Sequence, residues 1–135
     1  MIKYCIGRIF SYSAVNQKKS YLIPSLIHKI KAAKNKCIIF KNLSHYRDFS
    51  SLKSICRAIN ILEKNKSEGI YNICSGRPIS LEDIAKYICV KFDKKFVFQQ
   101  NKKTFLIGNI NKLNKLGFVN KENFYRHLNF LIKNN

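Results

Sequence analysis

The chain has 135 residues, of which 46% are hydrophobic and 24% are charged, a size and composition typical of one globular domain. It contains no run of 18 apolar residues and no signal-peptide pattern, so neither a membrane span nor a secretory precursor is expected. Lys and Arg number 26 against 7 Asp and Glu, a formal net charge of +19. Most of these cations are lysines that lie among many Asn and Ile residues, an excess that a coding bias toward A and T explains. A dedicated polyanion-binding surface is less favoured, because the lysines are spread along the whole chain and not grouped in blocks.

The cysteines and histidines give no sign of a metal site or a catalytic pair. Five cysteines is an odd number, and with no CxxC pair they suggest neither a disulfide framework nor a zinc site. Each lies beside Ile, Val or Tyr, which predicts buried free thiols and a cytoplasmic location. The histidines (His28, His45 and His127) have no Cys or carboxylate at a ligand spacing. The cysteines are Cys5, Cys37, Cys56, Cys74 and Cys89.

The first half of the chain predicts strands separated by two helices. A β-branched and aromatic run over residues 2–10 predicts a buried strand, and the polar residues 11–20 predict a loop. A helix follows with Pro24 in its first turn, then a short strand over residues 36–40 and a strand position at 47–49. A second helix comes next. Apolar residues at helical spacing mark the two buried faces: Ile23, Leu26, Ile27 and Ile30 in the first helix, and Leu52, Ile55, Cys56, Ile59 and Leu62 in the second.

The second half of the chain continues the alternation. Gly69 is expected to end the second helix, and residues 70–74 predict a strand leading into a turn at 75–78. Ser80 with Asp83 three residues later predicts a capped helix, followed by a strand over 95–99 and a short helix closed by Gly117. The last two long helices are expected to bury Leu81, Ile84, Ala85 and Ile88, and Phe124, Leu128, Leu131 and Ile132.

This alternation of strands and helices is typical of an α/β fold. No repeat or linker divides the chain, so residues 1–135 are expected to form one unit. The five glycines stand alone, and a phosphate-binding loop or a dinucleotide-binding fingerprint cannot be built from them.

Arg47 is the main candidate for ligand chemistry. An Arg beside a short strand can present two parallel N–H groups to phosphate oxygens, which a lysine cannot do. The alternative is a structural ion pair between Arg47 and its neighbour Asp48. At Ser75 and Gly76 a plain turn is expected, with a close approach of the backbone to another group as the alternative. Glu82 and Asp83 fit the first turn of a helix.

Several segments carry a resemblance to a known family: residues 8–17, 21–30, 42–49 and 71–76. They resemble the C-terminal half of an extended short-chain dehydrogenase/reductase, in the NAD-dependent epimerase/dehydratase family that modifies nucleotide sugars. Asn42-Leu43-Ser44 before Arg47-Asp48-Phe49 is most similar to the GDP-6-deoxy-mannose reductase (GDP-4-keto-6-deoxymannose reductase) branch. Residues 108–118 resemble the closing Asp-x-x-Lys-Leu and Leu-Gly-Trp segment, with Asn109 replacing Asp and Phe118 replacing Trp.

The resemblance implies a fold and a set of roles. The fold would be the C-terminal strands of a Rossmann-like sheet plus a small mixed α/β substrate-binding subdomain, with the N-terminal dinucleotide-binding half missing. Arg47 would contact the diphosphate of a nucleotide sugar, and Ser11 would lie near the sugar and the nicotinamide. Asn16 and Gln17 would belong to a loop that closes over the substrate. Tyr71 and Asn72 would pack within the sheet.

The chain also departs from the family pattern. Ala14-Val15 stand where the family has Gly-Pro, and Leu52-Lys53-Ser54 stand where it has Val-x-Asp, which removes a carboxylate. The family's Tyr-x-x-x-Lys pair has no counterpart at its usual place. Tyr87 and Lys91 have the spacing but lie on a Lys-rich helix far from that place. No catalytic residue is therefore assigned.

We expect the substrate-binding portion of an NAD(P)-dependent nucleotide-sugar epimerase, dehydratase or reductase for cell-surface polysaccharide biosynthesis, inactive alone. NAD or NADP would bind the complete enzyme and not this chain alone. Its partners would be a nucleotide-diphosphate sugar and a separate chain carrying the dinucleotide-binding half. A split enzyme, a degenerate remnant and a truncated gene model all fit. The alternatives are a small basic nucleic-acid-binding protein, for which residues 94–98 come nearest, and a non-catalytic interaction module with a partner-covered sheet edge.

Overall fold

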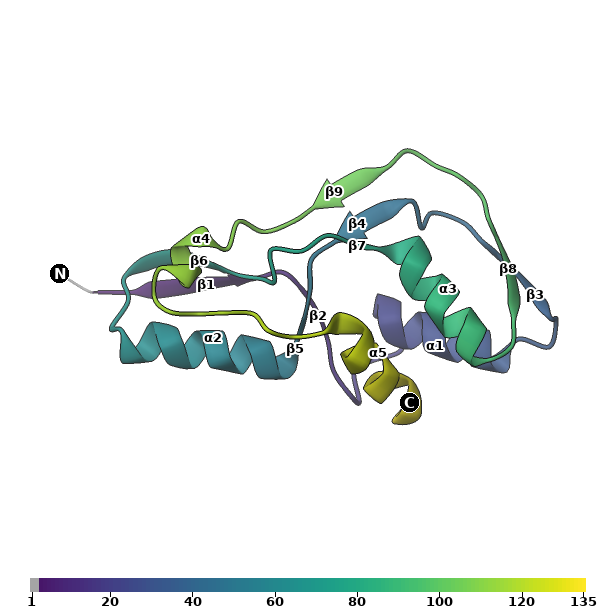
Figure 1. Cartoon of the computed structure of the whole chain (residues 1–135), viewed down its shortest axis with the longest axis horizontal. Helices are drawn as coiled ribbons and strands as arrows, with labels where there is room; N and C mark the ends of the chain where they lie inside the picture. Colours follow the sequence, from purple (N-terminus) through teal and green to yellow (C-terminus); the bar gives the residue numbers. More distant parts are fainter. Residues whose placement is uncertain (1–2) are drawn as a thin grey trace.

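A computed structural model describes residues 3–135, so Ile2, at the start of the first expected strand, lies outside the described residues. The described chain forms an elongated α/β molecule in which helices and strands alternate (Figure 1). Its strands form four small sheets, three of two strands and one of three. The expected fold class is confirmed.

One end of the molecule is well covered, and we call it the closed lobe. It consists of α1 (Leu22–Ala32), α3 (Leu81–Lys91), α5 (Phe124–Lys133) and the parallel strands β3 (Cys37–Phe40) and β8 (Lys95–Phe98). Ser80 caps α3, its Oγ accepting from the Asp83 N–H at 3.3 Å, as expected. The apolar stripes expected for these helices are buried, since Ile23, Leu26, Ile27, Ile30, Leu81, Ile84, Ala85, Ile88, Leu128 and Leu131 are all part of one core.

The other end is thin, and we call it the open lobe. β1 (Cys5–Ile9) pairs in parallel with β6 (Gly69–Ile73), and the pair is accompanied by α2 (Leu52–Lys64) and the short α4 (Asn111–Asn114). Every residue of β1 is exposed, so the expectation of a buried first strand is wrong for the described chain. The core of this lobe is small: Ile55, Ala58, Leu62, Tyr71, Ile73, Leu113 and Phe118.

Short strands join the two lobes. β2 (Ser11–Ser13) runs parallel to β5 (Phe49–Ser51). β4 (His45–Arg47) lies between β7 (Ile79–Ser80), which is antiparallel, and β9 (Thr104–Leu106), which is parallel. β2, β7 and β9 were not expected, and β2 lies in the segment expected to be a loop. Strands of two or three residues are too short to show an alternating pattern.

The carboxylate of Asp48 holds three segments of this middle region together. Asp48 is fully buried between β4 and β5. Its Oδ1 accepts from the Ser75 N–H at 2.6 Å, and its Oδ2 accepts from the N–H groups of Gly76 at 2.9 Å and Gly108 at 3.1 Å. The alternative considered for Arg47, an ion pair with Asp48, is therefore wrong, because backbone donors take this carboxylate. Likewise, the residues 75–76 form a close backbone approach and not a plain turn.

Gly108 illustrates how tight this junction is. A Cβ added there would collide with the Cys74 Sγ and lie 3.1 Å from the Phe10 ring. Only glycine therefore lets the backbone come close enough to donate to Asp48. Burial first and the Asp48 charge second raise the pKa of the Cys74 thiol, a backbone hydrogen bond from Gly76 lowers it, and the net result is a pKa of about 11.

A second carboxylate, Glu122, anchors the amino end of α2. Its Oε2 accepts from the Ser51 N–H at 3.0 Å and from the Ser54 Oγ at 3.1 Å. Ser51 also caps the helix, its Oγ accepting from the Ser54 N–H at 3.2 Å. The carboxylate that the family pattern places at residue 54 is absent, and Glu122 supplies one from a distant part of the chain.

Two expectations about burial need correction. The inner face of α2 consists of Ile55, Ala58 and Leu62, while Leu52, Cys56 and Ile59 are exposed, because the thin sheet covers only one narrow side of this helix. All five thiols are free, as expected, but Cys5, Cys37 and Cys56 are exposed and only Cys74 and Cys89 are buried. None of the helices between residues 3 and 135 is long and apolar enough to cross a bilayer.

Candidate functional site

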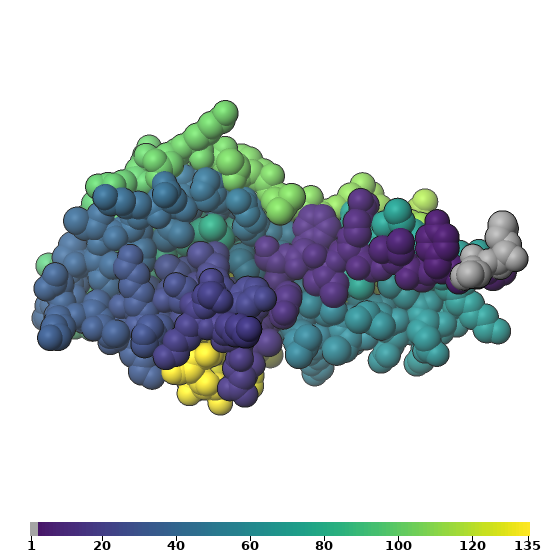
Figure 2. All heavy atoms as spheres, turned by 180° about the vertical axis from the view of Figure 1, so that it is seen from behind, coloured from purple at the N-terminus to yellow at the C-terminus, as the bar shows by residue number. Residues whose placement is uncertain are grey.

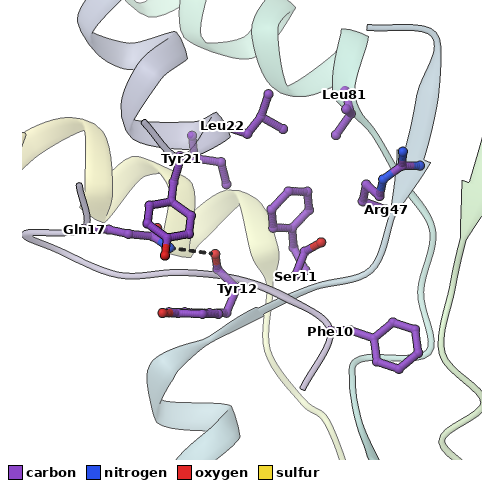
Figure 3. A pocket seen from close by; sticks show the side chains of 10 residues that line it. Phe10, Ser11, Tyr12, Gln17, Tyr21, Leu22, Arg47 and Leu81 are labelled. Carbon is purple, nitrogen blue, oxygen red and sulfur yellow. Dashed lines mark hydrogen bonds between the residues drawn. The ribbon is translucent and has the colours of Figure 1, made fainter. Parts of the chain in front are cut away.

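A cavity of about 340 Å³ opens where the two lobes meet (Figure 3). It lies beside β2, β4 and β5 and below the first turns of α1 and α3. This volume is at the small end of the range usual for ligand pockets. Its wall consists of Phe10, Ser11, Tyr12, Gln17, Tyr21, Leu22, Ile23, Arg47, Phe49 and Leu81.

The backbone around Asp48 explains why Arg47 reaches this cavity. In an extended chain, successive side chains point to opposite sides. Because the Asp48 carboxylate points to the backbone donors of residues 75, 76 and 108, its neighbours Arg47 and Phe49 point the other way, and both line the cavity. The parallel pairing of β2 with β5 places Ser11 opposite Phe49.

The guanidinium of Arg47 is held on one side and open on the other. Its Nη1 donates to the Tyr46 carbonyl at 2.8 Å and to the Thr104 Oγ1 at 3.1 Å, and that hydroxyl lies 2.9 Å from the His45 Nδ1. Within residues 3–135, no group accepts from Arg47 Nε or Nη2. No carboxylate lines the cavity. Arg47 therefore offers an adjacent pair of N–H donors and an unbalanced positive charge to an anion.

Three of the four residues singled out from the sequence come together here. Ser11, Gln17 and Arg47 all line the cavity, whereas Asn16 does not. Asn16 is exposed, in a turn with φ of 64°, a left-handed conformation that Asn tolerates better than most residues. Gln17 donates from Nε2 to the Tyr12 carbonyl at 3.4 Å, and its Oε1 is buried without a hydrogen-bond partner among the described residues.

The apolar part of the wall was missed by the sequence reasoning. Tyr12 lies near the start of the segment 11–20 that was expected to be a loop, and Tyr21 directly follows it. Figure 3 shows both close to Gln17, on the opposite side of the cavity from Arg47. Phe10, Leu22 and Leu81 complete this wall. The aromatic residues at both ends of an otherwise polar segment are the signal that could have indicated it.

The Tyr87–Lys91 pair and His127, which do not line the cavity, make contacts within the fold. The Lys91 Nζ lies 5.3 Å from the centre of the Tyr87 ring, a packing contact that agrees with the view of this pair as a coincidence of spacing. His127 Nε2 lies 3.0 Å from the Ser13 carbonyl oxygen and 3.1 Å from the Ser13 hydroxyl, and these contacts connect α5 to β2. No local pattern indicated this pair, since the two residues lie 114 positions apart. Residues 3–135 contain no group of three or more potential metal ligands.

The rings of Phe96 and Phe98 bear on the nucleic-acid alternative. Both pack against the core of the closed lobe, and Phe98 stacks on Phe40 with ring centres 5.6 Å apart. Single-stranded nucleic acid is held by aromatic rings that are free to stack on bases. These two rings face inward, so residues 94–98 offer charge without a stacking surface.

Comparison with models of known protein families shows to which family the chain belongs. The family model described as GDP-mannose 4,6 dehydratase matches residues 1–131. The chain belongs to this family. The comparison with curated proteins found no match.

Solved structures of family-like enzymes share the fold. RMD from Pseudomonas aeruginosa, in complex with NADPH, superposes with a TM-score of 0.83 at 16% identity, over 96% of this chain and 47% of that one. The dTDP-glucose 4,6-dehydratase of Bacillus anthracis, in complex with NAD, gives 0.74 at 19% identity, over 96% and 43%. The UDP-glucose 4-epimerase of Thermotoga maritima, with UDP-glucose, gives 0.75 at 17% identity, over 98% and 45%. The chain thus spans about half the length of the structures it matches.

Proposed function

We propose that this chain is the substrate-binding portion of a nucleotide-sugar epimerase, dehydratase or reductase, and that Arg47 binds the diphosphate of the nucleotide sugar. The observation that carries the proposal is the state of the Arg47 guanidinium. It lines a cavity without carboxylates, and two of its nitrogens have no acceptor among the described residues. Such a group matches a diphosphate, whose oxygens can accept both N–H groups at once.

The rest of the cavity suits the sugar part of such a ligand. The buried Gln17 Oε1 can accept from a sugar hydroxyl, and the Ser11 hydroxyl can donate or accept. The rings of Tyr12 and Tyr21 provide apolar faces beside these polar groups. Asn16, outside the cavity wall, would act by shaping the turn that carries Gln17. The segment before Arg47-Asp48-Phe49 favours the GDP-6-deoxy-mannose reductase branch within this class.

The residues of this chain do not fit a dinucleotide. A glycine-rich loop binds pyrophosphate through free backbone N–H groups. Here the Gly76 and Gly108 N–H groups both donate to Asp48, and the remaining glycines lie apart in the fold. We therefore assign this chain binding and orientation of the substrate but no step of hydride or proton transfer. NAD or NADP would be held by the part of the complete enzyme that the solved structures contain and this chain does not match.

We further propose a cytoplasmic location and a role in supplying nucleotide sugars for cell-surface polysaccharides. The five free thiols, three of them exposed, support a reducing compartment. The polysaccharide role rests on the proposed substrate class alone.

Calorimetry with GDP and UDP tests the proposal. Arg47→Ala is expected to weaken binding of the preferred diphosphate by about 1.5–3 kcal/mol, since it removes a charge-assisted contact. Arg47→Lys should fall between the two, because a lysine keeps the charge and loses the paired N–H groups. Arg126→Ala is the matched control, as it removes the same charge from α5, outside the cavity wall. Equal affinity of the parent and Arg47→Ala would refute the assignment.

A further inference from the structure

Another cavity, of about 380 Å³, lies on the open lobe. It shares no lining residue with the cavity of Arg47. Figure 2 shows the purple β1 along the surface of this lobe, with yellow-green atoms of the segment that contains α4 above it. The polar wall of the cavity consists of three cations, Arg8, Lys112 and Lys115, and three asparagines, Asn72, Asn109 and Asn111.

The parallel pairing of β1 with β6 orients the guanidinium of Arg8. This pairing places Arg8 directly opposite Asn72, and Arg8 Nε donates to Asn72 Oδ1 at 3.1 Å. The Asn72 amide is itself held, because its Nδ2 donates to the Asn109 carbonyl at 3.1 Å. No group within residues 3–135 accepts from Arg8 Nη1 or Nη2. The guanidinium is therefore fixed along one edge and offers its two terminal nitrogens to a ligand.

Two lysines add positive charge from the other side of the cavity. Lys112 and Lys115 lie three residues apart in and at the end of α4, a spacing that places both on one face of a helix. The Lys112 Nζ donates to the Ile70 carbonyl at 2.8 Å and lies 3.9 Å from the centre of the Tyr71 ring. An ammonium group has three N–H donors, so Lys112 can still donate to a ligand from this fixed position.

No carboxylate balances these three cations. None of the seven Asp and Glu residues of the chain lines this cavity. Asn109 stands where the family pattern has Asp. The Asn109 Oδ1 accepts from the Asn111 N–H at 3.0 Å, a hydrogen bond that an Asp would also make, so the residue present differs from Asp mainly in charge. An anion in the cavity would therefore reduce the repulsion among the cations.

We propose that this cavity binds a dianionic phosphate group, as free phosphate or as the end of a small phosphate monoester. Three cations suit the two charges of a phosphate better than the single charge of a carboxylate, and the Arg8 nitrogens match phosphate oxygens. Nucleic acid is disfavoured, because the Tyr71 ring is 7% exposed and lies next to the Lys112 ammonium, which leaves bases no ring to stack on. This site is independent of the function proposed for Arg47.

NMR titration with inorganic phosphate at constant ionic strength tests the site. We expect saturable shifts of the Asn72 side-chain amide and of the backbone amides of residues 109–115. Arg8→Gln should raise the Kd at least tenfold, because it removes the oriented guanidinium, whereas the matched control Arg126→Gln, on α5, should change it less than twofold. Shifts that do not saturate, or an equal Kd for the parent and Arg8→Gln, would overturn the proposal.

A carboxylate placed in the cavity wall gives a second test. Asn109→Asp keeps the acceptor for the Asn111 N–H and should raise the Kd for phosphate at least tenfold, because it adds a like charge beside the ligand. Asn60→Asp adds the same charge at an exposed position of α2, outside this wall, where salt screens it, and should change the Kd less than twofold. An unchanged Kd for a folded Asn109→Asp variant contradicts the site.

Further ligands identify the source of the phosphate. Tighter binding of glycerol 3-phosphate than of inorganic phosphate would assign a monoester, and the reverse would assign free phosphate. Glycerol is the control and should cause no shifts. Tighter binding of an oligothymidylate at the same residues would assign nucleic acid and overturn the proposal. Arg47→Ala should leave the Kd at this site unchanged, so a failure here and a failure of diphosphate binding at Arg47 are separable.

Discussion

The closed lobe and the open lobe have similar kinds of residue but different degrees of burial. In the closed lobe, Ile84 and Ile88 of α3 share one core with residues of α1, α5 and the strand pair, and they have no exposed surface. In the open lobe, a strand pair of similar length has α2 beside one face, and the apolar residues of β1 stay exposed. A parallel strand pair needs cover on both faces, and only the closed lobe supplies most of it from its own chain.

Of the substitutions considered, one at Asp48 should lower the free energy of unfolding most. Asp48→Asn keeps the shape but places an amide where three backbone N–H groups need an acceptor. We expect a loss of about 3–5 kcal/mol in the free energy of unfolding, as for other buried charges that lose their partners. Urea denaturation measures it, with Asp93→Asn, on the surface between α3 and β8, as the control. A loss below about 1 kcal/mol would show that the Asp48 carboxylate does not hold these backbone segments together.

Truncations in the two lobes should differ in cost. Ile84→Ala, fully buried in the closed lobe, is expected to lower the free energy of unfolding by about 2–4 kcal/mol, because it leaves a cavity. Ile6→Ala, 48% exposed in β1, should cost less than about 1 kcal/mol. Equal costs in the isolated chain would mean that β1 is covered in solution.

Amide hydrogen exchange should resolve the two edges of β1. The N–H groups of Arg8 and Phe10 face β6, and those of Gly7 and Ile9 face outward. We expect the outward pair to exchange at least about tenfold faster in the isolated chain, since their N–H groups have no strand partner. NMR exchange rates at these four residues measure the difference. Similar rates on both edges would contradict the open edge.

A smaller effect should follow pH at the junction. Because the folded-state pKa of Cys74 is raised to about 11 from an ordinary 9.0, the unfolded chain loses its thiol proton first. The resulting stability is fully present below pH 9 and declines as the pH rises toward 11. Cys74→Ser should flatten this decline, while Cys56→Ser, at an exposed thiol, should not. Denaturation midpoints between pH 8 and 11 measure it, and parallel curves for Cys74→Ser and the parent would contradict it.

The sequence predicted the helices well because each carries several apolar residues at a regular spacing. Ile23, Leu26, Ile27 and Ile30 are buried in α1 as expected, and Ser80 caps α3. It could not predict β2, β7 and β9, whose two or three residues depend on distant strands for their pairing. It also predicted a buried β1. The apolar side chains of β1 are typical of a buried strand, but the described residues leave every residue of this strand exposed.

Only part of the site was predicted, because most of the cavity wall depends on contacts between distant segments. Arg47 stood out because its chemistry is recognisable from one residue and its neighbours. The cavity wall depends on tertiary contacts among β2, β5, α1 and α3, and no local pattern shows that Phe10, Leu22 and Leu81 will meet. For the same reason the partners of Asp48 could not be predicted, since the backbone donors that bind its carboxylate lie more than 25 residues away in sequence.

The contact of Glu122 with the start of α2 has a consequence for where a ligand can settle. The amino end of a helix attracts anions through its free N–H groups and its dipole. In this protein the carboxylate of Glu122 already lies there, on the Ser51 N–H and the Ser54 hydroxyl. An incoming phosphate would meet a like charge at that helix and a free cation at Arg47. The protein's own side chain thus occupies the anion site at the amino end of α2, and Arg47, on the wall of a cavity without carboxylates, is the group left at the junction of the lobes to hold a ligand's phosphate.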